Sequence, residues 1–555
     1  MTQAPVVIFL YNRPYQTIKT LIYLMKNSLC RSTDLIIFSD GFKKKNRLDK
    51  KKVELVRNII KNIHGFKSKK IFFRKKNFGL YKNITTGLDT VFTSNDKAII
   101  LEDDILVNKF FLKYLNNALQ IYKTDRNVSS IHGWFCEHNK KIPNTFFLRG
   151  SDIWGWATWK RSWKEFNNKP KNLIKRFEEN PNLIKKFNLN NSYDYYGLLK
   201  KRALGLNQSW GVLWNASNFL KKNFYLNFSS SLCINIGQDD SGVHTVKNDD
   251  YFNQKLNNKK IKIVRQKIIE NLNGEQIKID FFRNFSNKPL LQRVINFLLR
   301  KINFYQKAIS FIGPIDNWKV ALENSKGYDN NIILKNVLKN TLIAKNNLFF
   351  FERDGYLLRK NSISHNQLHL IMNIVNIKNR GLNIVDFGGS LASNYFKTRD
   401  IIDQKHKNKW HVIEQKNFVD LGNKILKSKN LNFYNSINNI KNKKIDLIIF
   451  SGSLQYLENP TEVFEEVLKF NPEFILIERL PIMNKQSKNE IYIQKKGKYS
   501  YPVWHFTKKH LQLLLKYKYR LVENLSSEFD HDLYFRNRKI KFCGYIYKLN
   551  KIKVC

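Results

Sequence analysis

Short apolar runs alternate with segments of helical periodicity along the first 104 residues. The apolar runs predict strands within 5–14, 34–41, 69–80 and 97–104, and the periodic segments predict helices at 15–28, 53–63 and 81–92. Strands that alternate with helices of about 10–15 residues indicate a parallel α/β sheet. Ligands of such sheets bind beyond the carboxyl ends of the strands. A functional site is therefore expected at that edge.

A second α/β pattern begins further along the chain. It contains the runs LNIVDFGGSLASNYF (382–396), KWHVIEQ (409–415), KIDLIIFSGSLQYLENP (444–460) and EFILIERLP (473–481). No repeat of fixed period links the two halves. We therefore expect two different α/β domains, 1–265 and 312–555, since domains usually hold roughly 100–200 residues.

The segment between these domains, residues 266–311, has another character. Its second half, PLLQRVINFLLRKINFYQKAISFIG, is a basic amphipathic helical stretch with no strand partners. We interpret it as a helical connector whose apolar face docks on a domain, although such a stretch can also lie on a membrane surface.

Polar residues follow three of the predicted N-terminal strands. They are Asn12-Arg13, Asp40-Gly41 and Glu102-Asp103-Asp104. Three adjacent carboxylates could form a solvated turn. Here they follow an apolar strand that belongs in the middle of a sheet, and carboxylate oxygens suit Mg²⁺ or Mn²⁺. A divalent ion that bridges a diphosphate would stabilise it as a leaving group.

The ordered set PVVIFLYNRP, IFSDG, NFGL and ILEDD resembles the GT-A-type glycosyltransferases, most closely the branch of N-acetylglucosaminyltransferase I and its bacterial relatives. SDIWGWATWKRSW and LCINIGQDDSGVHT resemble further blocks of those relatives. The resemblance covers roughly residues 4–250. It implies a nucleotide-sugar-binding GT-A fold, a donor such as a UDP-sugar, and a divalent metal.

The resemblance also implies roles for individual residues. Asp103 and Asp104 would bind the metal, and Glu102 would contact ribose or the metal shell. Asp40 would contact the base or the ribose. His244 would complete the metal or diphosphate site, unless it is an ordinary loop histidine.

The acceptor side of this site is less well defined. Trp154, Trp156 and Trp159 would wall an acceptor site or belong to the core. An inverting transfer needs a carboxylate base near the acceptor hydroxyl. In the relatives we expect that acid near NQSWGVLW, where this chain has none. The substitutes are Asp152, Asp239 and Asp240.

The second domain contains a Gly-Gly turn after a predicted strand, with Asp386 at the strand end and Gly388-Gly389 after it. Glycine allows the backbone to approach a ligand closely. Glu414, at the end of the next strand, is placed to bind ribose hydroxyls. GxGxxG is missing, so the turn alone is weak evidence.

Together with DLIIFSGSLQYLENP, these residues resemble the class I S-adenosylmethionine (SAM)-dependent methyltransferases. GYDNNIILKNVL, FFFERDG and SYPVWHF resemble a methyltransferase family of bacterial surface-polysaccharide gene clusters. The resemblance implies a Rossmann-like fold over residues 312–549.

It also implies that Asp386, Gly388 and Gly389 line the methionine end of SAM, and that Glu414 binds its ribose. The segment from Ser451 to Tyr456 would close over the cofactor. His505 is a candidate base for the acceptor proton, with a packing role as the alternative. Glu478 and Arg479 would hold the acceptor or pair with each other.

The formal net charge of +52 suggests nucleic-acid binding at first sight. The lysines, however, are scattered along a chain that is also crowded with Asn, Ile, Phe and Tyr, which indicates compositional drift. No nucleic-acid motif is present, so a nucleic-acid methyltransferase is suggested by charge alone. An anionic membrane surface is the favoured charged partner.

The five cysteines are widely spaced and include no CxxC pair, which fits a reducing compartment. The chain has no recognisable signal peptide and no run of roughly 18 apolar residues. We expect a cytoplasmic protein, peripheral to the inner membrane if it binds one.

These patterns predict a bifunctional enzyme of cell-surface polysaccharide biosynthesis. One domain would transfer a sugar to a glycan or lipid-linked glycan acceptor, and the other would transfer a methyl group from SAM. The competing hypothesis is a membrane-recruited scaffolding protein with one or both sites inactive.

Overall fold

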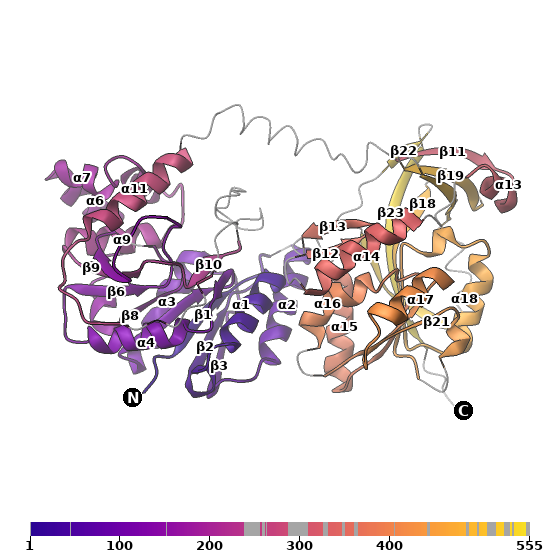
Figure 1. Ribbon diagram of the computed structural model, residues 1–555, viewed down its shortest axis with the longest axis horizontal. Coiled ribbons are helices and arrows are strands. Elements are labelled where there is room, and N and C mark those ends of the chain that lie inside the picture. Colours follow the sequence, from indigo (N-terminus) through magenta and orange to yellow (C-terminus); the bar gives the residue numbers. More distant parts are fainter. Residues whose placement is uncertain are drawn as a thin grey trace. The chain divides into compact units, whose positions relative to one another are not determined.

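The computed structural model divides the chain into two compact units, Met1–Asn296 and Phe297–Cys555 (Figure 1). Each unit is described by itself. The structure describes residues 2–44, 46–150, 152–237, 256–257, 261, 263–286, 309–325, 331–346, 350–359, 365–403, 406–440, 444–483, 488–496, 499–507, 515, 518–526, 533–535 and 538–550. Of the predicted site residues, Asp239, Asp240 and His244 lie outside these ranges.

Unit 1 is built on an eight-stranded mixed sheet in the order β3-β2-β1-β4-β8-β6-β9-β7. Its strands are β1 (Val6–Leu10), β2 (Asp34–Ser39), β3 (Ser68–Phe73), β4 (Lys97–Glu102), β6 (Val128–His132), β7 (Thr145–Leu148), β8 (Trp156–Trp159) and β9 (Phe224–Phe228). β1 is parallel to both β2 and β4. The sheet order therefore reverses between β1 and β4, which is where doubly wound sheets bind their ligands.

Helices flank this sheet, and the first three of them, α1 to α3, were predicted from the periodicity. They are α1 (Pro14–Met25), α2 (Arg47–Lys61), α3 (Gly79–Ser94), α4 (Phe111–Ile121), α5 (Lys160–Trp163), α6 (Pro170–Glu178), α7 (Asn182–Phe187), α8 (Tyr195–Ala203), α9 (Gly211–Leu220) and α11 (Leu272–Ser286), with a 3-10 turn η1 (Cys30–Ser32). A small antiparallel pair, β5 (Ile105–Val107) and β10 (Cys233–Asn235), follows the end of β4.

Two of the three tryptophans predicted near an acceptor belong to the core. Trp156 is buried and its ring stacks on Trp210, with ring centroids 5.6 Å apart. Trp159 is also buried. Trp154 is half-buried, and its ring meets Trp134 edge-on at 5.1 Å. The structure thus favours the core alternative for Trp156 and Trp159.

Both described ends of the expected connector belong to folded units. α11 packs on β7 of unit 1, and Glu270 just before it forms a bridge with Phe147. At the other end, β11 (Ile309–Ile315) pairs antiparallel with β19 (Glu490–Lys496) of unit 2. The expectation that this segment has no strand partner is therefore wrong at its C-terminal end. Residues 287–308, with most of the amphipathic stretch, lie outside the described ranges.

Unit 2 is built on a second sheet, in the order β16-β15-β14-β17-β18-β23-β21, with β22 paired to β23. Its strands are β14 (Asn383–Phe387), β15 (Lys409–Ile413), β16 (Leu431–Tyr434), β17 (Leu447–Ser451), β18 (Phe474–Met483), β21 (Tyr519–Ser526), β22 (Leu533–Phe535) and β23 (Arg538–Leu549). The first five strands of the order are parallel, and β23 is antiparallel to β18. They follow the 3-2-1-4-5 order of a Rossmann-type sheet.

Further elements surround this sheet. The helices are α13 (Trp318–Glu323), α14 (Asn331–Asn346), α15 (His365–Lys378), α16 (Ser393–Ile402), α17 (Lys416–Ile425) and α18 (Pro460–Lys469), with 3-10 turns η3 (Ile437–Asn439) and η4 (Leu454–Tyr456). β12 (Phe350–Arg353) and β13 (Tyr356–Arg359) form a hairpin, and β11, β19 and β20 (Tyr499–His505) form a three-stranded sheet.

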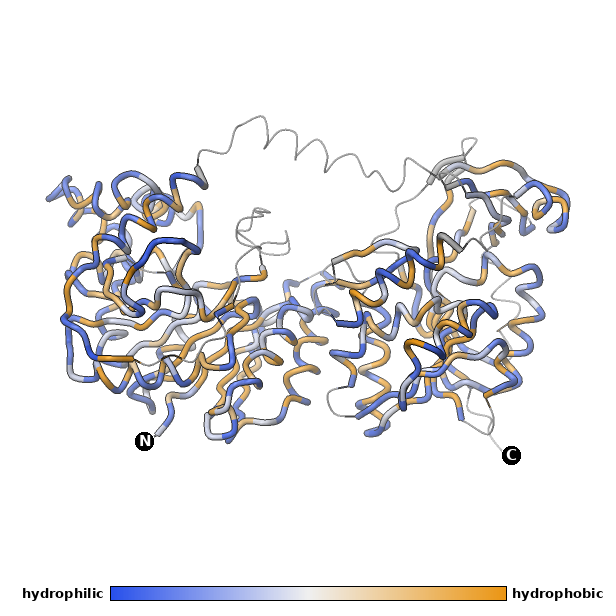
Figure 2. The backbone as a smooth tube through the Cα atoms, viewed as in Figure 1, coloured by the Kyte–Doolittle hydropathy of each residue, from blue (hydrophilic) through white to orange (hydrophobic). Residues whose placement is uncertain are grey.

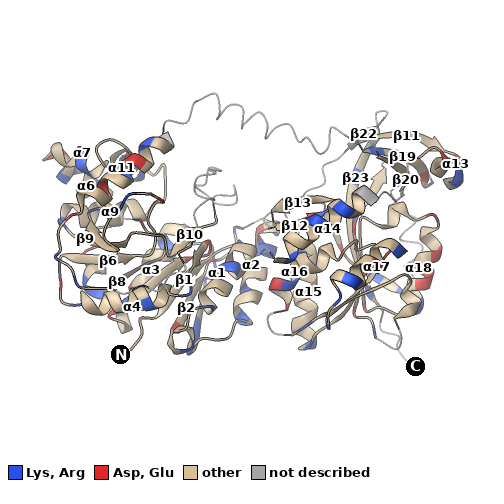
Figure 3. Ribbon diagram, viewed as in Figure 1, with Lys and Arg blue, Asp and Glu red and all other residues tan. Residues whose placement is uncertain are grey.

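Hydropathy follows this architecture. Figure 2 shows hydrophobic positions along the central strands and alternating hydrophobic and hydrophilic positions along the helices. Lys and Arg occur on helices of both units (Figure 3). Within the described ranges, no helix is long and apolar enough to cross a membrane.

Candidate functional site

The carboxyl edge of the unit 2 sheet carries a turn that only glycine fits. Gly388 has φ +68°, and a Cβ there would lie 2.4 Å from Cβ of Ser453 in the loop after β17. A Cβ on Gly389 would lie 2.6 Å from Cγ of Asp386. The backbone therefore runs close to two neighbours at the point where the sheet order reverses between β14 and β17.

Asp386 ends β14 in full burial. Burial raises the pKa of its carboxyl to about 7, although Asn394 of α16 donates a 3.0 Å hydrogen bond to Oδ1. Oδ2 is buried and has no hydrogen-bond partner within the described ranges. A buried acceptor without a donor costs about 1–3 kcal/mol, so it marks a place for a ligand donor.

Glu414 follows β15 and holds the same turn. Its Oε1 accepts the N–H of Ser390 at 2.9 Å, and its Oε2 accepts the N–H of Gln415 at 2.9 Å. Burial raises the pKa of this carboxyl. Ser451 ends β17 half-buried, and the nearby Ser453 hydroxyl donates to the Phe387 carbonyl at 2.7 Å. The ends of β14, β15 and β17 thus bring together residues that are far apart in sequence.

Two charged residues that were not among the predicted site residues also lie here. Lys397 of α16 is buried, and its amine donates to Asn394 Oδ1 at 2.9 Å. Burial, opposed in part by the charge of Glu478, lowers its pKa to about 8. Lys397 follows Asn394 by three positions, so the two side chains lie on the same face of α16. Helical spacing counted from the Gly-Gly turn is therefore the sequence signal that points to Lys397.

The second is Glu352 of the β12–β13 hairpin. Its carboxylate accepts the hydroxyl of Ser393, the first residue of α16, and the N–H of Gly355 at 2.8 Å. Burial raises the pKa of Glu352 to about 7. The hairpin is thereby attached to the helix that follows the Gly-Gly turn. The block FFFERDG contains Glu352, but the resemblance gave this residue no role, because its contact with Ser393 joins positions 41 apart.

Arg479 forms an ion pair with the β12–β13 hairpin. Its Nη2 lies 3.0 Å from Oδ2 of Asp354 in the hairpin turn. Arg479 has φ +60°, within a stretch of β18 where the register with β23 shifts. A left-handed conformation of this kind costs about 1–3 kcal/mol and is concentrated at functional positions. Glu478 is buried, and the binding of an acceptor by Glu478 or Arg479 stays a prediction.

His505 is placed as a packing residue. It is fully buried at the end of β20, between Tyr492, stacked at 4.4 Å, and Phe311, edge-on at 4.9 Å. Neither ring nitrogen has a hydrogen-bond partner within the described ranges. A base needs access to the acceptor proton, so this geometry favours the packing alternative over the predicted base.

Burial lowers the pKa of His505 to about 3. In the unfolded chain the imidazole of His505 takes up a proton near pH 6.5, whereas in the folded chain it does so only near pH 3. The neutral histidine therefore costs no stability above about pH 6.5, and the folded state loses stability as the pH falls from there toward 3. We expect His505→Phe to remove this loss, which amounts to at most about 1.4 kcal/mol per pH unit. Urea unfolding of the full chain between pH 4 and 7 measures it. An unchanged pH slope together with loss of methyl transfer would restore the role of base.

In unit 1 Glu102 ends β4 and Asp103 and Asp104 follow it, and both aspartates contact an arginine. Arg13 contacts Asp103 through Nη2, and the same nitrogen lies 2.9 Å from Oδ2 of Asp104. Burial, together with the charges of Asp104 and Asp103, raises the pKa of Glu102 to about 8. Burial also raises the pKa of Asp103, against the opposing effect of Arg13.

The divalent metal that the resemblance implies does not fit these residues. Arg13 already supplies the positive charge for Asp103 and Asp104. Across the described part of the chain, no group of three or more His, Cys, Asp or Glu side chains is arranged to hold a metal ion. The structure therefore does not support the prediction that Asp103 and Asp104 bind a metal, and the predicted third ligand, His244, lies outside the described ranges.

Asp40 is used by the fold. Its Oδ1 accepts the N–H groups of Gly41 and Phe78, both at 2.8 Å. Its Oδ2 accepts the N–H of Gly79 at 3.0 Å and the amide of Asn77 at 3.2 Å. Burial raises its pKa despite these bonds. These contacts indicate that Asp40 fixes the loop before α3, rather than presenting free oxygens to a base or ribose.

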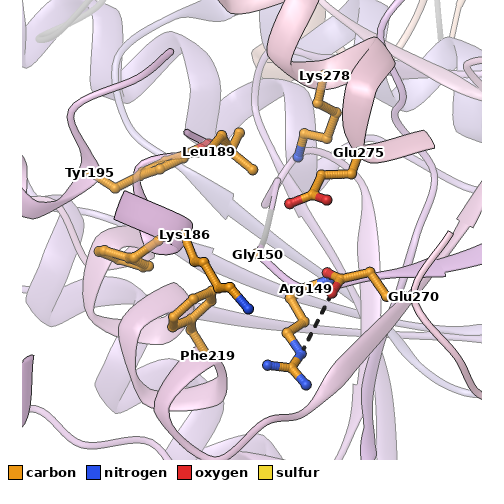
Figure 4. Close-up of a pocket in the computed structure, with 10 residues that line it drawn as sticks. Arg149, Gly150, Lys186, Leu189, Tyr195, Phe219, Glu270, Glu275 and Lys278 are labelled. Carbon is orange, nitrogen blue, oxygen red and sulfur yellow. Dashed lines mark hydrogen bonds and ion pairs between the residues drawn. The ribbon is translucent and has the colours of Figure 1, made fainter. Parts of the chain in front are cut away.

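Asp152 forms an ion pair with Lys278 of α11. Only 3% of the Lys278 side chain is exposed, and 14% of that of Asp152. Lys278 also lines a pocket with Glu275, whose carboxyl has its pKa raised by burial and by Glu270 (Figure 4). In the same pocket Arg149 Nε lies 3.9 Å from Glu270. Asp152 is thus a paired carboxylate beside a pocket with charges of both signs.

No family model and no curated protein matches the chain. Solved structures similar to it include a Burkholderia thailandensis 1,6-didemethyltoxoflavin-N1-methyltransferase with bound S-adenosylhomocysteine, at 10% identity and TM-score 0.25, over 44% of this chain and 95% of that one. Another is the N-terminal domain of EvdMO1 with SAH and D-fucose, at 8% identity and TM-score 0.26, over 39% and 97%. A third is a protein from Pyrococcus horikoshii OT3, at 12% identity and TM-score 0.24, over 32% and 86%.

Proposed function

We propose that unit 2 is a SAM-dependent methyltransferase. The observation that carries this proposal is the turn after β14, where Gly388 and Gly389 leave no room for a Cβ. A buried acceptor oxygen of Asp386 there receives no hydrogen bond from any residue that the structure describes. The backbone can approach a ligand closely there, and the ammonium group of a methionine moiety would supply the missing donor. These features of the turn are consistent with SAM as its ligand.

The other residues of the edge have roles consistent with this cofactor. Glu414 orients the turn through two backbone N–H groups and would accept hydrogen bonds from ribose hydroxyls. Lys397 lies beside Asp386 and favours its ionised form. When bound, SAM supplies a methyl group on a sulfonium. The protein then has mainly to align the acceptor and receive one proton from it.

For unit 1 we propose transfer of a sugar from a nucleotide-sugar donor, such as a UDP-sugar, to a glycan or lipid-linked glycan. The order β3-β2-β1-β4 supports a nucleotide site where Arg13, Glu102 and the loop after β2 meet the carboxyl edge. The chain would then both extend and methylate a cell-surface glycan. The competing proposal is a scaffolding protein with an inactive unit 1, because the expected base and metal ligands are not assembled by the described residues.

Separate binding measurements on the full chain test the two activities. We expect SAM to bind by calorimetry, and Glu414→Gln to weaken it by about 10-fold, since a hydrogen bond to a charged group contributes roughly 1.5–3 kcal/mol. Glu462→Gln, an exposed carboxylate of α18, is the matched control and leaves the affinity unchanged. Equal affinities for the wild type and Glu414→Gln would contradict the assigned ribose contact.

The transferase activity of unit 1 is measured by release of the nucleotide from UDP-sugars. Release that is absent from every donor tried, with SAM binding intact, would support the scaffolding alternative for unit 1 alone.

A further inference from the structure

Arg13 occupies a central position at the carboxyl edge of unit 1. It immediately precedes Pro14, the first residue of α1, so the start of the helix fixes its backbone. Its guanidinium contacts the carboxylates of both Asp103 and Asp104, which follow the neighbouring strand β4. A planar guanidinium is suited to hold two carboxylates at once, and it stays charged at any physiological pH.

The surroundings close this cluster. The backbone at Gly237 is so near that a Cβ there would lie 2.0 Å from Asp104 Oδ2 and 2.7 Å from Arg13 Nη1. The Asp104 carbonyl accepts the N–H of Ile236 at 2.9 Å, and the Asp103 carbonyl accepts the Thr20 hydroxyl at 2.9 Å. Only 16%, 5% and 8% of the side chains of Arg13, Asp103 and Asp104 are exposed.

A divalent ion could reach these carboxylates only if Arg13 left them. Burial disfavours the charged guanidinium, but the charges of Asp103 and Asp104 outweigh this effect and raise the pKa of Arg13. Removing one member of a buried ion pair is strongly unfavourable, because it leaves the other charges without compensation. The ion would also have to displace the backbone at Gly237, which lies against Asp104 and Arg13.

We propose that Arg13 takes the place of the divalent cation in unit 1, so that nucleotides bind at this edge without a metal. The replacement of the cation by Arg13 involves only residues 13, 103 and 104. Nucleotide binding without a metal rests on the function proposed for unit 1. In this arrangement the two aspartates serve to position Arg13 and to join the loop after β1 to the turn after β4.

Titration of the full chain with MnCl₂ alone, followed by electron paramagnetic resonance, tests whether Arg13 takes the place of the cation. We expect no Mn²⁺ site in the wild type that depends on Asp104, so that wild type and Asp104→Asn give the same curve. Arg13→Gln should gain a site, with affinity raised at least about 10-fold, which Arg13→Gln combined with Asp104→Asn loses again. Arg31→Gln, an exposed arginine of η1, removes the same charge and should gain nothing.

One tight Mn²⁺ site in the wild type that Asp104→Asn abolishes would overturn the proposal. This comparison does not involve Arg13→Gln, so it decides the question even where that variant fails to fold.

Calorimetry with UDP and GDP tests whether nucleotides bind to unit 1 without a metal. We expect equal affinity in EDTA and in MnCl₂. Binding only in the presence of MnCl₂ would overturn the metal-free site. Absence of binding in both buffers would instead overturn the function proposed for unit 1, and the Mn²⁺ titration would still decide the role of Arg13.

Discussion

Gly388→Ala is expected to weaken SAM binding by at least 10-fold, which corresponds to about 1.4 kcal/mol. An added Cβ would lie 2.4 Å from Cβ of Ser453, so either the turn or the loop after β17 must move. That movement changes the position of the Gly389 backbone relative to the buried Oδ2 of Asp386. Calorimetry with SAM on the full chain measures the effect.

The backbone strain of an alanine at positive φ must be separated from this collision. Gly205 has φ +74° and nothing within 4 Å of its Cβ position, so Gly205→Ala carries the strain without the contact. We expect it to cost about 1–2 kcal/mol in the stability of unit 1 and to leave SAM affinity unchanged. If Gly388→Ala bound SAM as the wild type does, the turn would not be the cofactor site.

Lys278→Met should lower the free energy of unfolding of unit 1 by about 3–5 kcal/mol. The amine of Lys278 is the partner of Asp152, and both side chains are largely shielded from water. Removing the amine leaves a carboxylate in a poorly solvated place with no compensating charge. Chemical unfolding of the full chain, followed by tryptophan fluorescence, gives the change.

The chain offers a control on the same helix. Asp280 of α11 pairs with Lys140 at 2.8 Å, but their side chains are 42% and 55% exposed. Asp280→Asn should therefore change stability by less than about 1 kcal/mol. The double variant Asp152→Asn, Lys278→Met should be less destabilised than the sum of the two single changes, because no charge is left alone. Additive losses would show that the two side chains do not depend on each other.

The same experiment bears on the role of Asp152. A carboxylate engaged by a buried lysine does not present a free oxygen to an acceptor hydroxyl. If Asp152→Asn with Lys278→Met retained sugar transfer, the base would have to come from elsewhere in unit 1.

The hydrophobic pattern by itself predicted the two α/β halves and most of the parallel strands of their sheets, namely β1 to β4 in unit 1 and β14, β15, β17 and β18 in unit 2. The runs at 5–14, 34–41 and 97–104 became β1, β2 and β4, and those at 382–396 and 409–415 became β14 and β15. Such runs are informative because a central parallel strand is buried on both faces, so nearly every position must be apolar.

The pattern also placed candidate residues at the correct edge of each sheet. Asp386 and Glu414 lie at neighbouring strand ends, and the Gly-Gly turn lies at the switch point, because strand direction alone sends these positions to one edge. Local sequence sufficed there, since each feature depends on the residues next to it.

What each carboxylate does was decided only by the tertiary structure. Asp104 was expected to hold a metal and Asp152 to act as a base, yet each is engaged by a cation far away in the chain, Arg13 and Lys278 respectively. A free carboxylate and a paired one look identical in sequence. Their chemistry differs because a buried charge is unfavourable unless an opposite charge or a hydrogen-bonding group lies next to it. Only the fold determines which group lies there.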